Sequence, residues 1–227
     1  KEFYATIHSK PVYKCSIEEA EMIKVTYNTY ITMKICLANV VMEAAHKLDN
    51  VNCDNVMKGL FLGTERLMSP KYLLGGMGDG GGCHPRDNIA LRYMAEELEL
   101  GYDLFDAIMN AREKQAKNLA SRLVIEANKV NLPIVILGKA YKPDVHYEDG
   151  STSILTGHFC ESAYGSKYKV SYDPTEPIKA VYLLGHMGKH HDYDFPDGSV
   201  IVDPWRAYTK GDKDITVIHY GNTRIRK

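Results

Sequence analysis

The chain has 227 residues, of which 44% are hydrophobic and 25% charged, so it is a globular protein with room for one large domain or two small ones. The formal net charge is −1, and lysine and arginine are spread along the chain, which argues against nucleic acid as the main partner. No apolar run approaches the ~18 residues of a membrane span, no signal-peptide pattern opens the chain, and five cysteines without C-x-x-C spacing indicate a cytoplasmic setting without disulfides or structural zinc.

The first half of the chain is predicted to be helical. After an irregular stretch over residues 1–15, Ser16-Ile17-Glu18-Glu19 has the pattern of a capping box, and the apolar spacing that follows predicts one long helix over residues 17–48. A helix of that length is typical of a span between domains or of a dimer interface. Shorter helices are predicted over residues 53–61, 86–99 and 103–130.

A glycine-rich run, Gly75 to Gly82, leads into Cys83, and residues 63–84 as a whole are predicted to form a loop. Glycine permits close approach of backbone to a ligand, and a cysteine where a helix begins meets the positive end of the helix dipole, which favours the thiolate. Pro85 suits the first helical turn, and Asp87 follows four residues after the cysteine. A nucleophilic cysteine in a ligand-binding loop and an inert buried cysteine in a turn are both compatible with this spacing.

The second half changes character at Pro133. Ile134–Leu137 is a short apolar run flanked by Pro133 and Gly138, which predicts a strand buried on both faces of a parallel sheet. A helix over residues 152–164 and strands over residues 169–172, 180–184, 199–202 and 215–218 follow. Only about seven residues join the strand that ends at Tyr172 to the next, too few for an ordinary crossover, so we expect a narrow sheet of about five strands with an irregular connection.

The predicted fold class is therefore α/β. Residues 1–131 form an all-helical central region with one long helix, and residues 132–227 form a small doubly wound, Rossmann-like parallel sheet.

Four segments, taken together, resemble the UDP-glucose/GDP-mannose dehydrogenase family. Glu21–Asn28 resembles its central-helix motif, with Lys24 and Asn28 on one helical face; the glycine run that ends in Cys83 and Asp87 resembles its GxGxGGxCxxKD motif, with Arg86 in place of lysine. Leu137–Asp144 resembles its G-x-A-[FY]-K-x-D motif, and Val202–Arg206 resembles its aspartate-to-arginine motif. The matches occur in the family's order over nearly the whole chain.

The resemblance implies oxidation of the C6 alcohol of a nucleotide sugar, most simply UDP-glucose, to a carboxylate with two NAD⁺. By this analogy Cys83 captures the aldehyde as a thiohemiacetal and later carries a thioester. Lys24 would stabilise the developing oxyanion, Asn28 would donate to the same oxygen or to a water, and Asp87 would orient the hydrolytic water or act as a base. Alternatively, Lys24 and Asn28 could simply lie on the solvated face of a long helix.

Substrate binding is carried over to other positions. The resemblance implies that Arg66 reaches the sugar nucleotide across a homodimer formed through the long helix. The remaining substrate contacts that it implies are Tyr72, Leu73, Gly78, Gly80, Tyr141, Lys142 and Arg206. Each of the charged residues could instead be an ordinary surface or stacking side chain.

The sequence departs from the family in its cofactor features. No GxGxxG motif opens a helix after a strand, Glu148 and Asp149 stand where the family commonly has an arginine near the cofactor, and the chain begins just before the long helix. We therefore expect the N-terminal NAD-binding domain to be absent, no cofactor-binding residues to be assignable, and the isolated chain to be inactive. His186, His190 and His191 are interpreted as a polar loop rather than a metal site.

Three alternatives stay open. The chain could be a non-catalytic nucleotide-sugar-binding or dimerisation module, or a dehydrogenase that acts on GDP-mannose or a UDP-N-acetylhexosamine. The weakest alternative is an unrelated cysteine-dependent acyl-transfer enzyme, which would need a histidine base such as His84 beside Cys83.

Overall fold

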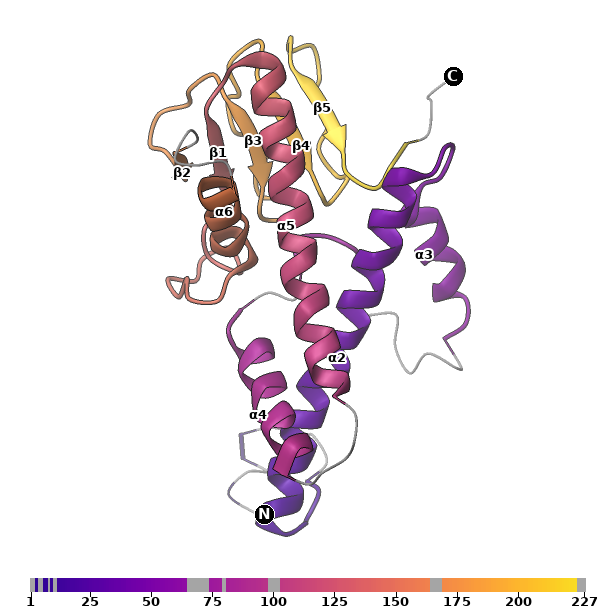
Figure 1. Cartoon of the computed structure of the whole chain (residues 1–227). Coiled ribbons are helices and arrows are strands. Elements are labelled where there is room, and N and C mark those ends of the chain that lie inside the picture. Colours follow the sequence, from indigo (N-terminus) through magenta and orange to yellow (C-terminus); the bar gives the residue numbers. More distant parts are fainter. Residues whose placement is uncertain are drawn as a thin grey trace.

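Five helices and a five-stranded sheet make up the described part of the protein. The structure is a computed structural model that describes residues 3, 6–7, 9, 12–64, 74–78, 81–97, 103–163 and 169–223. Its elements are α2 (Ile17–Lys47), α3 (Cys53–Phe61), α4 (Cys83–Glu97), α5 (Leu104–Val130), β1 (Ile134–Leu137), α6 (Thr152–Ala163), β2 (Val170–Tyr172), β3 (Val181–Leu184), β4 (Val200–Asp203) and β5 (Thr216–His219). Figure 1 shows α2, α4 and the first half of α5 as a helical arm below the sheet.

The long helix α2 begins at the predicted capping box. The Ser16 hydroxyl accepts a hydrogen bond from the Glu19 backbone N–H at 3.2 Å, and the Glu19 carboxylate accepts one from the Ser16 N–H at 2.8 Å. Two of the N–H groups that a helix start leaves unpaired are thereby satisfied. The predicted long helix over residues 17–48 is confirmed to within one residue.

All five strands are parallel, in the order β2-β1-β3-β4-β5. The order changes direction between β1 and β3, because β1 continues through α6 to β2 on one side while β3 lies on the other. The predicted irregular connection is confirmed, since residues 173–180 pass from β2 to β3 without a helix or strand. The carboxyl ends of β1 and β3 meet at this change of direction, where open parallel sheets bind ligands.

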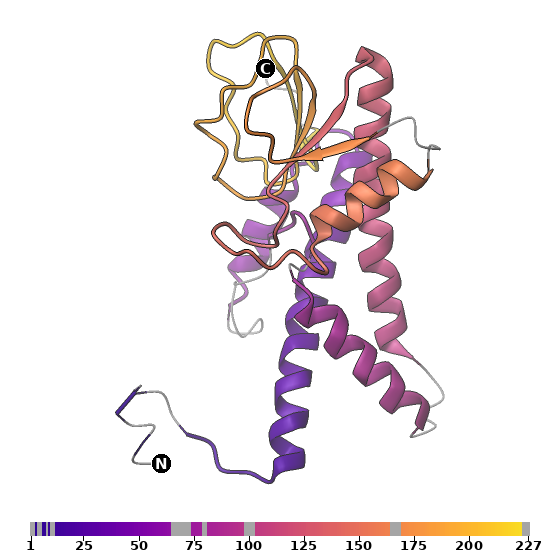
Figure 2. The same cartoon turned by 90° about the vertical axis from the view of Figure 1, so that its left-hand side faces the viewer.

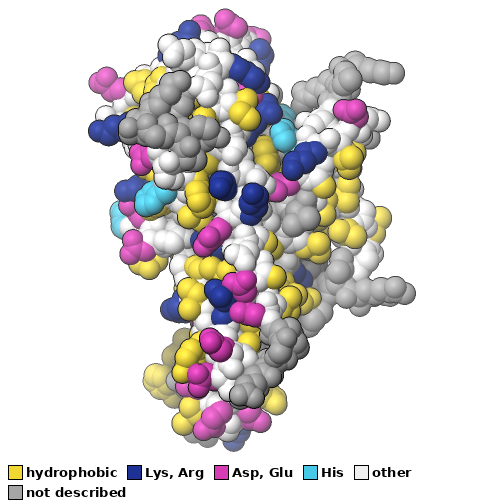
Figure 3. All heavy atoms as spheres, in the orientation of Figure 1, with side chains coloured by type: hydrophobic (Ala, Val, Ile, Leu, Met, Phe, Trp, Pro, Cys, Tyr) yellow, Lys and Arg dark blue, Asp and Glu magenta, His cyan; other side chains and the backbone are white. Residues whose placement is uncertain are grey.

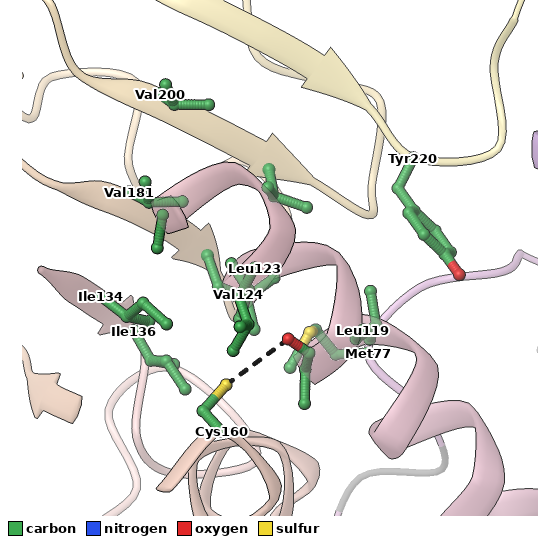
Figure 4. Close-up of a cluster of buried hydrophobic side chains, with 14 of the residues drawn as sticks. Met77, Leu119, Leu123, Val124, Ile134, Ile136, Cys160, Val181, Val200 and Tyr220 are labelled. Carbon is green, nitrogen blue, oxygen red and sulfur yellow. Dashed lines mark hydrogen bonds between the residues drawn. The ribbon is translucent and has the colours of Figure 1, made fainter. Parts of the chain in front are cut away.

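The main hydrophobic core lies between the sheet and two helices. Ile134 and Ile136 of β1 face Leu123 and Val124 of α5, while Cys160 of α6 points toward α5 and donates through Sγ to the Ala120 carbonyl at 3.8 Å (Figure 4). Alternate strand residues enter the opposite face, so all four residues of β1 are buried. The prediction of a strand buried on both faces is confirmed.

The second face of the sheet is covered differently. Figure 2 shows α5 and α6 on one side of the sheet and loops on the other. Phe195, from the loop after β3, packs edge to face on Tyr182 of β3, and Tyr208, from the loop after β4, packs edge to face on Phe195. Within the described residues, aromatic side chains from loops thus cover the face of the sheet that a second layer of helices covers in larger doubly wound sheets.

These features confirm the fold class, α/β with a helical region followed by a parallel sheet. Helix α5 belongs to both parts: its first half packs on α2 and α4, and its second half, from Leu119 to Ala127, enters the core beneath the sheet. The division of the chain at residue 131 stays a prediction.

Candidate active site

Cys83 is the first residue of α4, as the glycine-run argument predicts, and it is exposed. Helix α4 begins three residues earlier than the predicted residue 86, so that Pro85 lies in its first turn. Among the cysteines, Cys36, Cys53 and Cys160 are buried. Burial raises the pKa of Cys53 to about 11 and that of Cys160 to about 12, so both stay as thiols at neutral pH. Cys15 and Cys83 are exposed, and of these two only Cys83 lies within a helix, at its first residue.

Asp87 lies one helical turn after Cys83, on the same face of α4. Its Oδ2 accepts hydrogen bonds from Lys24 Nζ and from Asn28 Nδ2, both at 2.5 Å, and its Oδ1 accepts one from Arg86 Nε at 3.2 Å. Burial acts to raise the pKa of Asp87, but these three donors outweigh it and hold the pKa below its usual value. Asp87 is thus an anion at neutral pH.

Lys24 and Asn28 of α2 therefore contact Asp87 of α4, the helix that begins at Cys83. Lys24 and Asn28 lie one turn apart on the one helical face that their spacing predicts. Both point at Asp87 of α4, a meeting that the family resemblance implies. Each has hydrogen-bond capacity left, because an ammonium group has three protons and an amide has two.

A second contact between the two helices fixes His84. The Thr32 hydroxyl donates to the Asn28 carbonyl at 3.0 Å, and the His84 ring Nδ1 lies 2.7 Å from the same hydroxyl oxygen. The imidazole is thereby directed toward α2. The acyl-transfer alternative would need a contact between His84 and Cys83, and none is found among the described residues.

The glycine loop passes through a narrow seam between the helices and the sheet. A Cβ on Gly76 would collide with the Trp205 ring, one on Gly78 would lie 2.8 Å from Thr152 Oγ1, and one on Gly81 would lie 2.9 Å from the Tyr141 ring. Gly78 also has a φ of +87°, a region that favours glycine. These glycines therefore serve close packing within the chain, whatever they do for a ligand.

One residue that anchors this loop escaped the sequence reasoning. Asn39, buried in the middle of α2, accepts a hydrogen bond from the Gly76 N–H at 2.8 Å and donates to Gln115 of α5 at 3.3 Å. A lone asparagine within the apolar stretch of a long helix was the available signal, because a buried amide requires polar partners.

The predicted substrate residues have different surroundings. Tyr141 packs on Gly81, and the exposed Lys142 holds its ammonium group 5.5 Å from the Tyr141 ring centre, both on the loop after β1. Arg206 is buried, and all three of its guanidinium nitrogens donate to protein acceptors. A contact between Arg206 and a diphosphate would require these acceptors to be displaced. Arg66, Tyr72, Leu73 and Gly80 lie outside the described residues, and their roles stay predictions.

The loop between β1 and α6 carries two acidic residues. In the described part of the chain the only strand that leads into a helix is β1, and residues 138–151 between β1 and α6 carry Glu148, whose carboxylate lies 2.5 Å from Lys139 Nζ, and Asp149. The Glu148 carboxylate is therefore paired with a lysine of the same loop. Across the described ranges, no three His, Cys, Asp or Glu side chains are grouped as metal ligands, and no helix is both long and apolar enough to cross a bilayer.

Comparison with known proteins agrees with this geometry. Residues 18–114 match the central domain of the UDP-glucose/GDP-mannose dehydrogenase family. The helical part of the chain, with its Lys24–Asp87 contact and Cys83, belongs to that family.

Individual relatives extend the match into the sheet. UDP-glucose 6-dehydrogenase TuaD of Bacillus subtilis is 30% identical over 211 residues, 90% of this chain and 44% of TuaD. GDP-mannose 6-dehydrogenase of Pseudomonas putida is 33% identical over 132 residues, 58% of this chain and 29% of the relative. The chain thus spans less than half the length of these relatives.

Solved structures confirm the fold. A UDP-D-ManNAc dehydrogenase from Pyrococcus horikoshii superposes with a TM-score of 0.74 at 19% identity, over 99% of this chain and 57% of that one. A UDP-glucose dehydrogenase from Pyrobaculum islandicum superposes with a TM-score of 0.68 at 19% identity, over 90% and 51%.

Proposed function

We propose that this chain supplies the covalent half of the active site of a nucleotide-sugar 6-dehydrogenase. The observation that carries the proposal is the convergence of Lys24 and Asn28 on Asp87, one turn from Cys83 at the start of α4. UDP-glucose is the first candidate substrate, because TuaD is a UDP-glucose enzyme and its match covers most of this chain. GDP-mannose and a UDP-N-acetylhexosamine are the alternatives that the other relatives suggest.

The residues of this chain would act on the aldehyde stage of the reaction. The Cys83 thiolate adds to the aldehyde carbon, a C–S bond forms, and the carbonyl electron pair moves to oxygen. The Lys24 ammonium group donates to that oxygen, and Asn28 offers a second donor, so the new charge forms beside fixed dipoles. Protonation of the oxygen gives the thiohemiacetal.

Asp87 would act at the later hydrolysis of a thioester. Water forms a C–O bond to the acyl carbon and loses one proton to solvent. The C–S bond breaks with its electron pair on sulfur, so the acid leaves and Cys83 is restored as a thiolate. Because the pKa of Asp87 is lowered, its carboxylate holds a proton weakly and suits orientation of the water better than storage of its proton.

The hydride transfers are not assigned to these residues. NAD is the acceptor that we propose for the whole protein, and it would supply that chemistry. The non-catalytic alternative predicts binding of a nucleotide sugar without NADH formation, so an assay of NADH formation distinguishes the two.

We also propose that two copies pair through α2. The side chains of Ile23, Tyr27, Tyr30 and Leu37 are exposed, recur at intervals of three or four residues or a heptad, and so form one apolar stripe along the helix. Figure 3 shows further hydrophobic side chains over α3, where Val56, Leu60 and Leu62 are exposed. Apolar stripes of this kind mark interaction surfaces.

The test of the proposed function is NADH formation by the whole protein with UDP-glucose, GDP-mannose and UDP-N-acetylmannosamine in parallel. We expect one sugar to be oxidised to the acid, and Cys83→Ala to stop acid formation. Unchanged acid formation by Cys83→Ala would exclude the proposed role of the thiol.

A further inference from the structure

The guanidinium group of Arg206 is buried beside a single carboxylate. Its side chain is 2% exposed, and it pairs with Asp54 of α3 through two parallel bonds, Nε to Oδ2 and Nη2 to Oδ1, each 2.8 Å long. A buried charge of this kind is stable only when it is paired and its remaining protons are bonded. Here 152 residues separate the two partners along the chain.

The remaining donors of Arg206 hold backbone from three segments. Nη2 donates to the carbonyl of Gly75, the first residue of the glycine run, at 2.8 Å, and Nη1 donates to the carbonyl of Tyr220, just after β5, at 3.2 Å. Nη1 also donates to the Pro204 carbonyl. One side chain therefore ties the glycine loop, α3 and the ends of β4 and β5 together.

Trp205, the residue before Arg206, packs against the same part of the glycine loop. The Trp205 ring lies against Gly76, and its Nε1 donates to the Leu184 carbonyl at the end of β3 at 2.9 Å. Arg206 itself has a φ of +57°, a conformation that side-chain-bearing residues rarely adopt and that persists where the surroundings fix it. The turn after β4 is thus shaped to hold Gly75 and Gly76.

We infer that Arg206 and Asp54 form a positioning pair that fixes the glycine loop and, through it, Cys83 at the start of α4. The inference rests on the proposed function, in which Cys83 is the nucleophile. In this role Arg206 acts through the loop rather than on the phosphates of the nucleotide sugar, because every nitrogen of its guanidinium group is engaged within the protein.

The experiment compares Arg206→Lys, Asp54→Asn and the conservative Asp54→Glu with Arg122→Lys, a matched control whose arginine pairs with Glu126 on α5 at 2.9 Å. Amide hydrogen exchange is measured on the 227-residue chain without substrate. We expect at least tenfold faster exchange at Gly75–Met77 and in the first turn of α4 for Arg206→Lys and Asp54→Asn. Asp54→Glu should restore much of the protection, and the control should leave it unchanged.

The double variant Arg206→Met/Asp54→Asn separates positioning from simple stability. It leaves no lone buried charge, so its urea midpoint should recover toward wild type, while loop exchange stays fast. In the whole protein we expect its kcat to fall at least tenfold with KM within about twofold of wild type. A variant with those kinetics cannot have lost a phosphate ligand.

Two results would overturn the inference. One is unchanged loop exchange in folded Arg206→Lys and Asp54→Asn. The other is a tenfold rise in KM with normal loop exchange, which would make Arg206 a substrate ligand. Failure of the proposed function would be seen separately, as acid formation by Cys83→Ala.

Discussion

The ammonium nitrogen of Lys24 lies 2.5 Å from Oδ2 of Asp87, although 63 residues separate the two along the chain. The Asp87 side chain is 5% exposed, whereas that of Lys24 is 52% exposed. The carboxylate is therefore the fixed partner of the pair, and the lysine can turn toward a bound molecule while its neighbour stays in place.

Asp87→Asn should destabilise the chain by about 2 kcal/mol, because a buried acceptor of three donors becomes a neutral amide. Urea unfolding measures this loss. Asp106→Asn is the matched control: Asp106 pairs with Arg92 at 2.8 Å on the surface, and its replacement should change stability by less than about 1 kcal/mol. Equal losses of unfolding free energy in the two variants would contradict a stabilising role for the buried Asp87 carboxylate.

The same carboxylate should make stability depend on acidity. The pKa of Asp87 is lower in the folded protein than its usual value, so its stabilising contribution is complete above about pH 4 and is lost as the pH falls through the folded-state pKa. Urea midpoints of wild type and Asp87→Asn should therefore converge below about pH 4. A constant difference down to about pH 2 would be the contrary result.

Two glycines should respond to alanine in opposite directions. Gly76→Ala places a Cβ against the Trp205 ring in the seam that holds the glycine loop, and overpacking there should cost about 3 kcal/mol. Gly59→Ala lies within α3 with no atom within 4 Å of the new Cβ, and should stabilise the chain by about 0.5–1 kcal/mol. Thermal unfolding of both variants tests the pair; a tolerated Gly76→Ala would contradict the packing seen here.

His190 should add a second pH dependence at milder acidity. Burial, followed by the nearby His186, lowers the pKa of His190 to about 4. The unfolded chain binds this proton near pH 6.5 and the folded protein does not, so stability should be fully present above about pH 6.5 and decline toward pH 4. His190→Gln should flatten that decline in urea titrations, whereas replacement of the exposed His146 should leave it intact.

The α2 stripe should carry the self-association that we propose. Tyr30→Glu puts a charge in the stripe and should convert a dimer into a monomer in sedimentation equilibrium. Tyr93→Glu, on an exposed aromatic of α4 away from the stripe, is the control and should stay dimeric. A monomeric wild-type chain at micromolar concentration would argue against pairing through α2.

Local patterns predicted the elements well. Ser16 and Glu19 marked the start of α2, and the apolar Ile134–Leu137 run marked β1, because capping and burial on both faces are written into adjacent residues. The shared helical face of Lys24 and Asn28 followed from their spacing, whereas their meeting with Asp87 was implied only by the family resemblance.

Long-range partners were beyond the reach of these patterns. The residues near Arg206 do not predict that it pairs with Asp54. Asp54 lies on α3, so the contact depends on how α3 packs against the turn after β4. The glycines at 76 and 81 read as ligand-approach positions, yet their nearest neighbours are Trp205 and Tyr141. The sequence alone does not show whether a glycine makes space for a ligand or for an aromatic side chain from a distant part of the chain.

The last described residues close onto the end of α2. Thr223 Oγ1 donates to the Leu48 carbonyl at 2.6 Å across 175 positions, and the Gly221 carbonyl accepts the Cys53 N–H at 3.2 Å. During synthesis the carboxyl end of α2 therefore lacks these partners until residues 221–223 have been made. Contacts of such wide sequence separation slow folding, so an incomplete nascent chain would be the species most in need of a chaperone.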